Sequence, residues 1–123
     1  MIKCGKAPYL ECSGHGFLPL SAFHARIKKL GNKSIEQLYQ AFKIMPDGRT
    51  GLSICEAKGR QAVNQVLAHE YYSKLWDMYV DENPYILPLI RQQTGLSDKF
   101  GQEGHCCQAI ELWRIRNDPK RSL

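Results

Sequence analysis

The chain has 123 residues, of which 43% are hydrophobic and 24% charged, and its net charge is +5. These values predict one globular domain with its own core, and no run approaches the roughly 18 apolar residues of a membrane span. The five cysteines are odd in number and no signal peptide is recognisable, so we expect reduced thiols in the cytoplasm. The positive charge favours an anionic partner, such as a phosphorylated compound or a nucleic acid.

The first residues contain glycine and proline between short apolar pieces. Residues 1–16 are therefore expected to be an irregular lead-in, with one short strand around residues 7–10. The spacing of Cys4 and Cys12 fits no common zinc motif, and we expect neither a metal ion nor a cofactor. Residues 23–28 alternate apolar and polar side chains, which predicts a half-buried strand with His24 exposed.

A helix is predicted to begin after Ser34, because Ser34 and Gln37 have the spacing of a capping box. Its apolar stripe recurs at intervals of three and four residues: Ile35, Leu38, Phe42 and Met45. A second face carries a polar row: Glu36, Gln40 and Lys43, with Tyr39 between the two stripes. On this pattern alone, the polar row is the solvated face of an amphipathic surface helix.

Three further helical segments are predicted in the middle of the chain. A capping box at Ser53 and Glu56 opens a short helix to about residue 64, with Gly59 inside it. The longest helix is expected at residues 66–82, with Trp76 at its boundary or lining a pocket and an apolar stripe made of Leu67, Tyr71, Leu75, Met78 and Tyr79. Asn83 and Pro84 predict the start of another helix, which ends at residues 94–95.

The rest of the chain is predicted to be a loop, a helix and a tail. Residues 96–104 are polar and contain glycines, which is typical of a loop that holds a ligand. The last helix is expected at residues 106–116, followed by a frayed tail at 117–123. The sum is one α+β domain over residues 1–123, predominantly helical, with about five helices and a small N-terminal β component.

The segment from Phe23 to Lys43 resembles the opening of NADAR (YbiA-like) domains, which have a short strand, a glycine turn and a helix of the form S-[VI]-E-H-x-[YF]-Q-x-x-K. The helix here reads S-I-E-Q-L-Y-Q-A-F-K, with Gln37 in place of histidine. Residues 57–60, A-K-G-R, are similar to a shortened form of the family's A-K-x-x-G-R. Closing elements of the family are matched by Phe100, Gly101, Gly104, Gln108 and Arg116, with Phe100 standing for tryptophan and Gln108 for asparagine. The likeness covers residues 17–117 and is that of a short, divergent member.

The resemblance implies a YbiA-like fold and an N-glycosidase-like hydrolase that acts on an ADP-ribosyl or phosphoribosyl bond to a nucleobase. Glu36 is then expected to stabilise the oxocarbenium-like state or to activate water, and Lys43 to give the departing base a proton or to attack the opened sugar. Phosphate is assigned to Lys58 and Arg60. Stacking on the base is assigned to Tyr39, Trp76 or Phe100. Further ligand contacts are expected from Gln40, Asp98, Gly101 and Gln108, with Asp98 or Glu103 as a second acid.

The alternative is a non-catalytic basic module that binds a nucleotide, ADP-ribose, nucleic acid or a protein partner. Small basic groups at residues 26–33 and 114–121 would carry such contacts. A catalytically dead relative that keeps nucleotide binding is a third hypothesis, because Gln37 and Gln108 depart from the family pattern. Oligomeric state stays open on the sequence.

Overall fold

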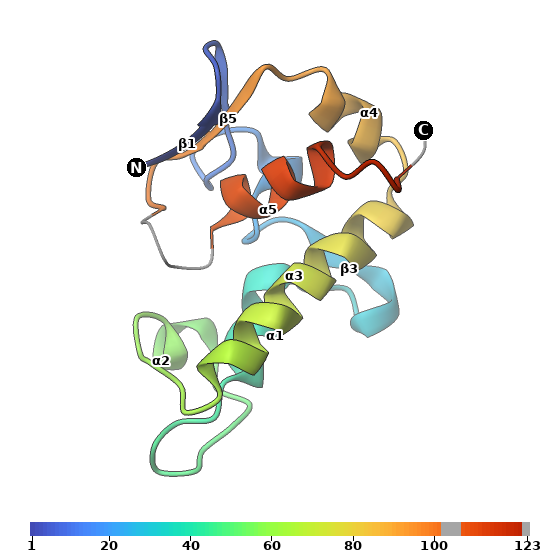
Figure 1. Ribbon diagram of the computed structural model, residues 1–123. Coiled ribbons are helices and arrows are strands. Elements are labelled where there is room, and N and C mark those ends of the chain that lie inside the picture. The colour runs from blue at the N-terminus through green and yellow to red at the C-terminus, as the bar shows by residue number, and fades with distance from the viewer. Residues whose placement is uncertain (102–106, 122–123) are drawn as a thin grey trace.

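The computed structural model describes residues 1–101 and 107–121, in which five α-helices accompany short strands (Figure 1). The helices are α1 (Ile35–Phe42), α2 (Ile54–Ala57), α3 (Gln65–Glu82), α4 (Ile86–Arg91) and α5 (Gln108–Arg116). The strands are β1 (Ile2–Gly5), β2 (Tyr9–Glu11), β3 (Arg26–Ile27), β4 (Lys33–Ser34) and β5 (Gly95–Asp98), and two 3-10 turns cover Leu18–Leu20 and Lys28–Leu30. The predicted α+β, mostly helical class is confirmed. None of the described helices is both long enough and apolar enough to cross a membrane.

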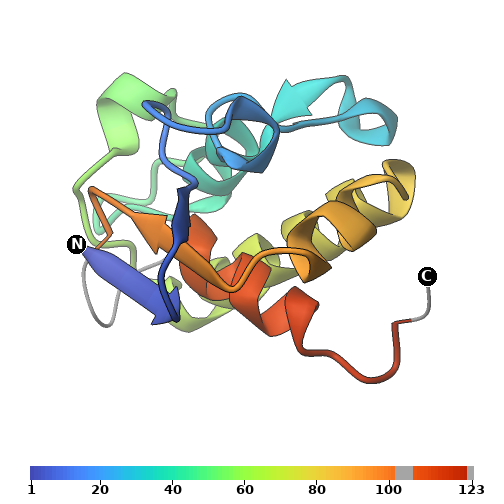
Figure 2. The same cartoon turned by 90° about the horizontal axis from the view of Figure 1, so that it is seen from above.

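The three-stranded sheet has β5 at its centre, antiparallel to β1 and parallel to β2. All four residues of β5 are buried, and Gly95 leaves no room for a side chain against the backbone oxygen of Lys6. Helix α5 packs against β1 and β5, crossing beneath the sheet in Figure 2. Strand β2 overlaps the strand predicted around residues 7–10, whereas β1 was not predicted. Residues 95–98 form a central strand, so the prediction of a loop from residue 96 is wrong over its first residues.

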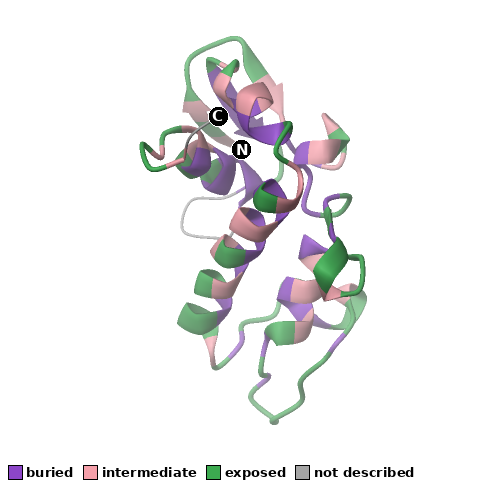
Figure 3. Ribbon diagram, turned by 90° about the vertical axis from the view of Figure 1, so that its right-hand side faces the viewer, coloured by how far each residue is buried: buried purple, intermediate pink, exposed green. Residues whose placement is uncertain are grey.

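Helix α3 supplies the middle of the core. Figure 3 shows a buried face of this helix turned toward the molecule and an exposed face turned outward. The buried face consists of Ala68, Tyr72, Leu75, Trp76, Tyr79 and Val80. Two residues of the predicted stripe, Leu75 and Tyr79, lie on this face, whereas Leu67 is 58% exposed. Trp76 was also misplaced by the sequence pattern, since it is fully buried in the core and lies at no boundary.

Helix α1 begins as predicted, because the Ser34 side chain accepts a hydrogen bond from the backbone N–H of Gln37 at 3.1 Å. Its burial agrees with the prediction only in part, because Ile35 and Met45 of the apolar stripe are buried. Phe42 is 38% exposed, whereas Gln40 and Lys43 are only 3% and 5% exposed. Two members of the polar row are therefore buried and Glu36 is half-buried, because α1 lies against both α2 and α3 and turns this row toward the loop after α2.

The segment around α2 forms a small separate cluster. The predicted capping box is present, with Ser53 and Glu56 each accepting from the other's backbone N–H. The helix ends at Ala57, earlier than predicted, and Gly59 lies outside it with φ +80°. A glycine adopts this left-handed conformation without strain, so it turns the chain sharply here. The segment's own apolar cluster contains Met45, Leu52, Ala57 and Ala62.

The remaining boundaries differ modestly from prediction. The alternation at 23–28 yields a strand only at β3, and His24 is exposed as expected. Asn83 closes α3 instead of starting α4. Residues 117–121 are held rather than frayed, because Arg121 forms ion pairs with Asp77 and Asp81 of α3 at 2.9 and 3.0 Å. Residues 122–123 lie outside the described residues.

Candidate functional site

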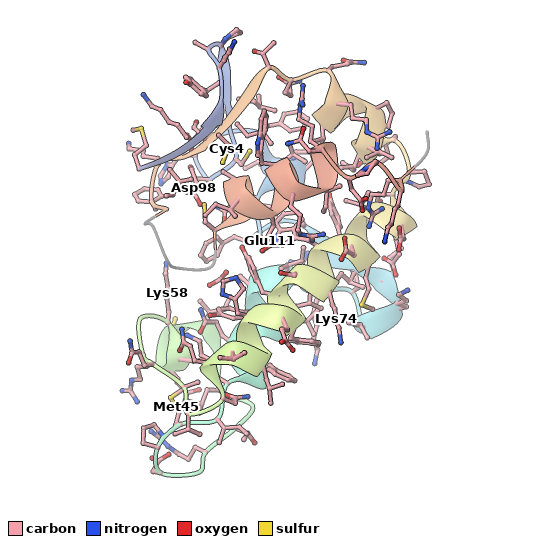
Figure 4. The ribbon with its side chains drawn as sticks, viewed as in Figure 1. Cys4, Met45, Lys58, Lys74, Asp98 and Glu111 are labelled. Carbon is pink, nitrogen blue, oxygen red and sulfur yellow. The ribbon has the colours of Figure 1, made fainter. Side chains whose placement is uncertain are left out.

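A cavity of about 510 Å³ lies where α1, the loop after α2, the end of β5 and the start of α5 meet. Glu36 enters it from α1, Asp98 from β5 and Gln108 from α5. Lys58 extends from the loop after α2 toward the end of the sheet that carries Asp98 (Figure 4). Four segments that are distant in sequence thus bring two carboxylates, an ammonium group and an amide to one cavity.

A smaller cavity of about 200 Å³ adjoins the first, because Glu36 and Gly59 line both. The other side chains around it are Tyr39, Gln40, Lys43, Arg60, Gln61 and Gln65. Glu36 and Lys43 therefore line one cavity, and Glu36 stands at the junction of the two spaces.

Glu36 is held by the next turn of its own helix. Gln40 Nε2 donates a hydrogen bond to Glu36 Oε1 at 2.7 Å. Burial raises the pKa of Glu36, whereas the bond from Gln40 and the charges of Lys58 and Lys43 lower it. The net pKa is above the ordinary value, because burial disfavours the charged form. Glu36 is thus a carboxyl group that keeps its proton to higher pH than an exposed glutamate.

Lys43 follows the last turn of α1 and reaches the backbone of the loop after α2. Its Nζ donates hydrogen bonds to the carbonyl oxygens of Ala57 at 3.3 Å and Arg60 at 3.1 Å. The same ammonium group lies 5.1 Å from the centre of the Tyr39 ring. Lys43 therefore fastens the loop that carries Lys58 and Gly59 to the end of α1.

Asp98 is buried at the end of β5, and two donors fix its carboxylate. The backbone N–H of Phe100 donates to Oδ1 at 3.0 Å and the thiol of Cys107 to Oδ2 at 3.2 Å. Burial, together with the charge of Asp98, raises the pKa of Cys107 to about 12, so the thiol stays protonated and donates. Gly101 is required beside it, since a Cβ there would come within 2.7 Å of Cys107 Sγ.

Two exposed phenylalanines, Phe23 and Phe100, are among the residues that line the larger cavity. Phe23 is 37% exposed and Phe100 62% exposed, and both also line a neighbouring hollow of about 400 Å³. Lys58 Nζ lies 4.8 Å from the ring centre of Phe23, and Lys99 Nζ 5.7 Å from that of Phe100. Rings with neighbouring cations suit a planar, anionic ligand. Sequence reasoning missed Phe23 because alternation favoured a buried position for it.

Most of the predicted site residues come together in these spaces. The larger cavity receives Glu36, Lys58, Asp98, Phe100, Gly101 and Gln108. The smaller one receives Tyr39, Gln40, Lys43 and Arg60. The expected phosphate pair is therefore divided, with Lys58 and Arg60 on different cavities. Trp76 belongs to the core and to neither cavity, and Glu103 lies outside the described residues.

The described residues contain no cluster of three or more His, Cys, Asp or Glu side chains that could hold a metal ion. The larger cavity presents two carboxyl groups beside an ammonium group. Comparisons with protein-family models, curated proteins and solved structures find no match for this chain. Its function must therefore be inferred from the two cavities and the side chains that line them.

Proposed function

We propose that this protein is an N-glycosidase-like hydrolase, related to NADAR domains, which cleaves the bond between a phosphorylated ribose and a nucleobase. One observation carries the proposal: the carboxylates of Glu36 and Asp98 line a single cavity together with Lys58. Ribosyl transfer passes through an oxocarbenium-like state, which a pair of carboxyl groups can serve as acid and base. The volume of about 510 Å³ lies within the range of roughly 300–1,000 Å³ that is usual for small-molecule sites.

In the proposed step, a water molecule attacks the anomeric carbon while the carbon–nitrogen bond to the base breaks. The electron pair of that bond leaves with the base nitrogen, which takes a proton from Glu36. Asp98 accepts a proton from the attacking water, and this proton returns to Glu36 through solvent after the products leave. The products are the free sugar phosphate and the protonated base, with no other reactant consumed.

This scheme gives the role of proton donor to Glu36, whereas the family resemblance offered it to Lys43 as one of two alternative roles. The raised pKa of Glu36 supports the exchange, because an acid must still hold its proton near neutral pH. Lys43 has a different use, since its ammonium group holds the carbonyls of Ala57 and Arg60. It positions the loop that carries Lys58, and Lys58 is our choice for the phosphate.

The test is incubation of the purified chain with an oligonucleotide that carries ADP-ribosylated guanine and, separately, with a base-linked ribosyl phosphate. We expect release of the base, and a fall of about 10²–10⁴-fold in rate for Glu36→Gln and for Asp98→Asn. The matched control is Glu70→Gln, which removes the charge of an exposed glutamate on α3. Circular dichroism checks that each variant is folded. Cleavage that survives in both cavity variants would contradict the proposal.

A non-catalytic module that binds nucleotides or nucleic acid is the second candidate, and the exposed rings of Phe23 and Phe100 beside lysines favour it. It predicts that Glu36→Gln leaves binding intact while reversal of exposed charges at Lys28 and Lys29 weakens it. It also predicts binding that falls steeply with salt concentration. Arg121 is unsuitable for such a test, because its ion pairs with α3 would be lost as well.

A further inference from the structure

The side-chain amide of Gln40 is only half used. Its Nε2 donates to Glu36 Oε1 at 2.7 Å, which fixes the orientation of the amide. Its Oε1 is buried and accepts no hydrogen bond from any side chain or backbone group within residues 1–101 and 107–121. Buried acceptors without a partner are rare in folded proteins, and a bound ligand is one thing that satisfies them. Gln40 lines the smaller cavity.

The smaller cavity has the size and polarity for a flat heterocycle. Its volume of about 200 Å³ lies below the roughly 300–1,000 Å³ of sites for drug-sized ligands, so it suits a ring system rather than a whole nucleotide. Gln61 and Gln65 bring two exposed amides to it, and Arg60 adds further donors. Each amide offers both a donor and an acceptor, which matches the edge of a nucleobase.

The two cavities meet at the group that would protonate the leaving base. Glu36 and Gly59 line both spaces, so a substrate that spans them would place its scissile bond beside the Glu36 carboxyl. Lys58 and the phenylalanines are on the larger side, where the sugar and its phosphate would be. The smaller side is then left for the base.

We propose that the smaller cavity is the subsite for the leaving nucleobase, and that Gln40 Oε1 accepts a hydrogen bond from a ring N–H or amino group of that base. The assignment of the base as a leaving group rests on the proposed function. One amide would then contact both the proton donor and the base, so a base without the N–H group would leave the Gln40 oxygen without a partner.

The first test uses free bases, which need no turnover. Uracil, thymine and 1,3-dimethyluracil are titrated into ¹⁵N-labelled protein, and the side-chain amide signals are followed by NMR. Uracil and thymine should shift the Gln40 signal together with those of Gln61 and Gln65. The dimethyl compound has no N–H and should bind about tenfold or more weakly. Thymine controls for the added bulk of a methyl group.

The second test uses variants of two glutamines on the same helix. Gln40→Met should abolish uracil binding, whereas Gln37→Met, at an exposed position one turn away, should retain it. The dispersion of the ¹⁵N spectrum shows whether each variant is folded. Should Gln40→Met fail to fold, the comparison of uracil with 1,3-dimethyluracil on the unaltered chain decides the question.

Three outcomes would overturn the inference: no binding of uracil or thymine, equal binding of the dimethyl compound, or shifts at Gln108 of the larger cavity instead of Gln61 and Gln65. Failure of the proposed function has a different signature. Base binding with the expected N–H preference, but no cleavage of any ribosyl substrate, would leave a base site in a protein that is not a hydrolase. Cleavage without the N–H preference would refute the subsite and leave the hydrolase.

Discussion

Glu36 is a carboxyl group on which burial and its neighbours act in opposite directions. Burial raises its pKa. The hydrogen bond from Gln40 and the charges of Lys58 and Lys43 lower the pKa by less than burial raises it. The folded chain therefore binds the Glu36 proton more tightly than the unfolded chain does. The protein therefore loses stability as the pH rises from the pKa of Glu36 in the unfolded chain to its pKa in the folded chain. Above the folded pKa, the full free-energy cost of burying the charged carboxylate remains.

Replacement of Glu36 by glutamine should therefore stabilise the fold at neutral pH, because a neutral amide avoids the cost of burying the charge. We expect a higher melting temperature for Glu36→Gln than for the unaltered chain at pH 7.5, and convergence of the two at pH 4 and below. Thermal melts across that range measure the difference. The exposed Glu70→Gln should show no such trend, and a lower melting temperature for Glu36→Gln at pH 7.5 would contradict the expectation.

The same proton should shape the dependence of the hydrolysis rate on pH. If Glu36 is the acid, kcat falls as the pH rises through its raised pKa, because the ionised carboxylate has no proton to give. A rate profile measured from pH 4 to 9 on a base-linked ribosyl phosphate would show this decrease in kcat above pH 4.5, the ordinary pKa of a glutamate. A rate that stays level to pH 9 would point to a lysine donor, since an ordinary lysine ammonium keeps its proton there.

At the scale of elements, the position of α1 depends on its contacts with α2 and α3. Lys43, which follows its last turn, donates to the carbonyl oxygen of Ala57 at the end of α2 and to that of Arg60 in the loop beyond. Lys43→Met keeps the length of the side chain but leaves those carbonyls with fewer donors. We expect a loss of about 1–3 kcal/mol in the free energy of unfolding, measured by denaturation with urea. Lys33→Met, at an exposed position, should change it little, and equal effects of the two variants would refute the role given to Lys43.

Local chemistry made the starts of α1 and α2 predictable, whereas the burial of individual side chains was not. Ser34 and Ser53 cap their helices through bonds that span three residues, and such signals can be read from the sequence alone. The buried polar row of α1 breaks the rule that apolar residues face inward, and such departures concentrate at functional sites. Strand β5 was missed because its sequence, GLSD, has turn-forming residues and its partners lie near the other end of the chain.

Most residues of the candidate site could be predicted from the sequence, but their arrangement around two cavities could not. Matching the residues of α1 to a family pattern selected Glu36, Gln40 and Lys43 together, because they share one helix. Nothing in the pattern could show that Lys58 and Arg60 belong to different cavities, since they are separated by a glycine with φ +80°. The sequence pattern selected Trp76 and not Phe23 as a site residue, because the exposure of an aromatic ring depends on packing against residues that are distant in the sequence.

At the scale of the whole molecule, the two apolar clusters differ greatly in size. The main core spans α1, α3, α4, α5 and β5, whereas the region around α2 rests on four residues. We expect amides of residues 44–62 to exchange with deuterium much faster than those in the middle of α3, because few buried contacts resist local opening. Hydrogen exchange followed by mass spectrometry measures this. Equal protection of the two regions would contradict it.

Strand β5 lies between the two N-terminal strands, so the sheet joins parts of the chain that are distant in sequence. Ile2 pairs with Asp98 and Glu11 with Ser97, so the sheet closes a stretch that covers most of the chain. Closing so long a loop costs conformational entropy that only late contacts repay, and such pairings form slowly. Asp98 reaches the larger cavity from β5, so it joins Glu36 there only when this sheet has formed. We therefore expect the larger cavity to be completed late in folding.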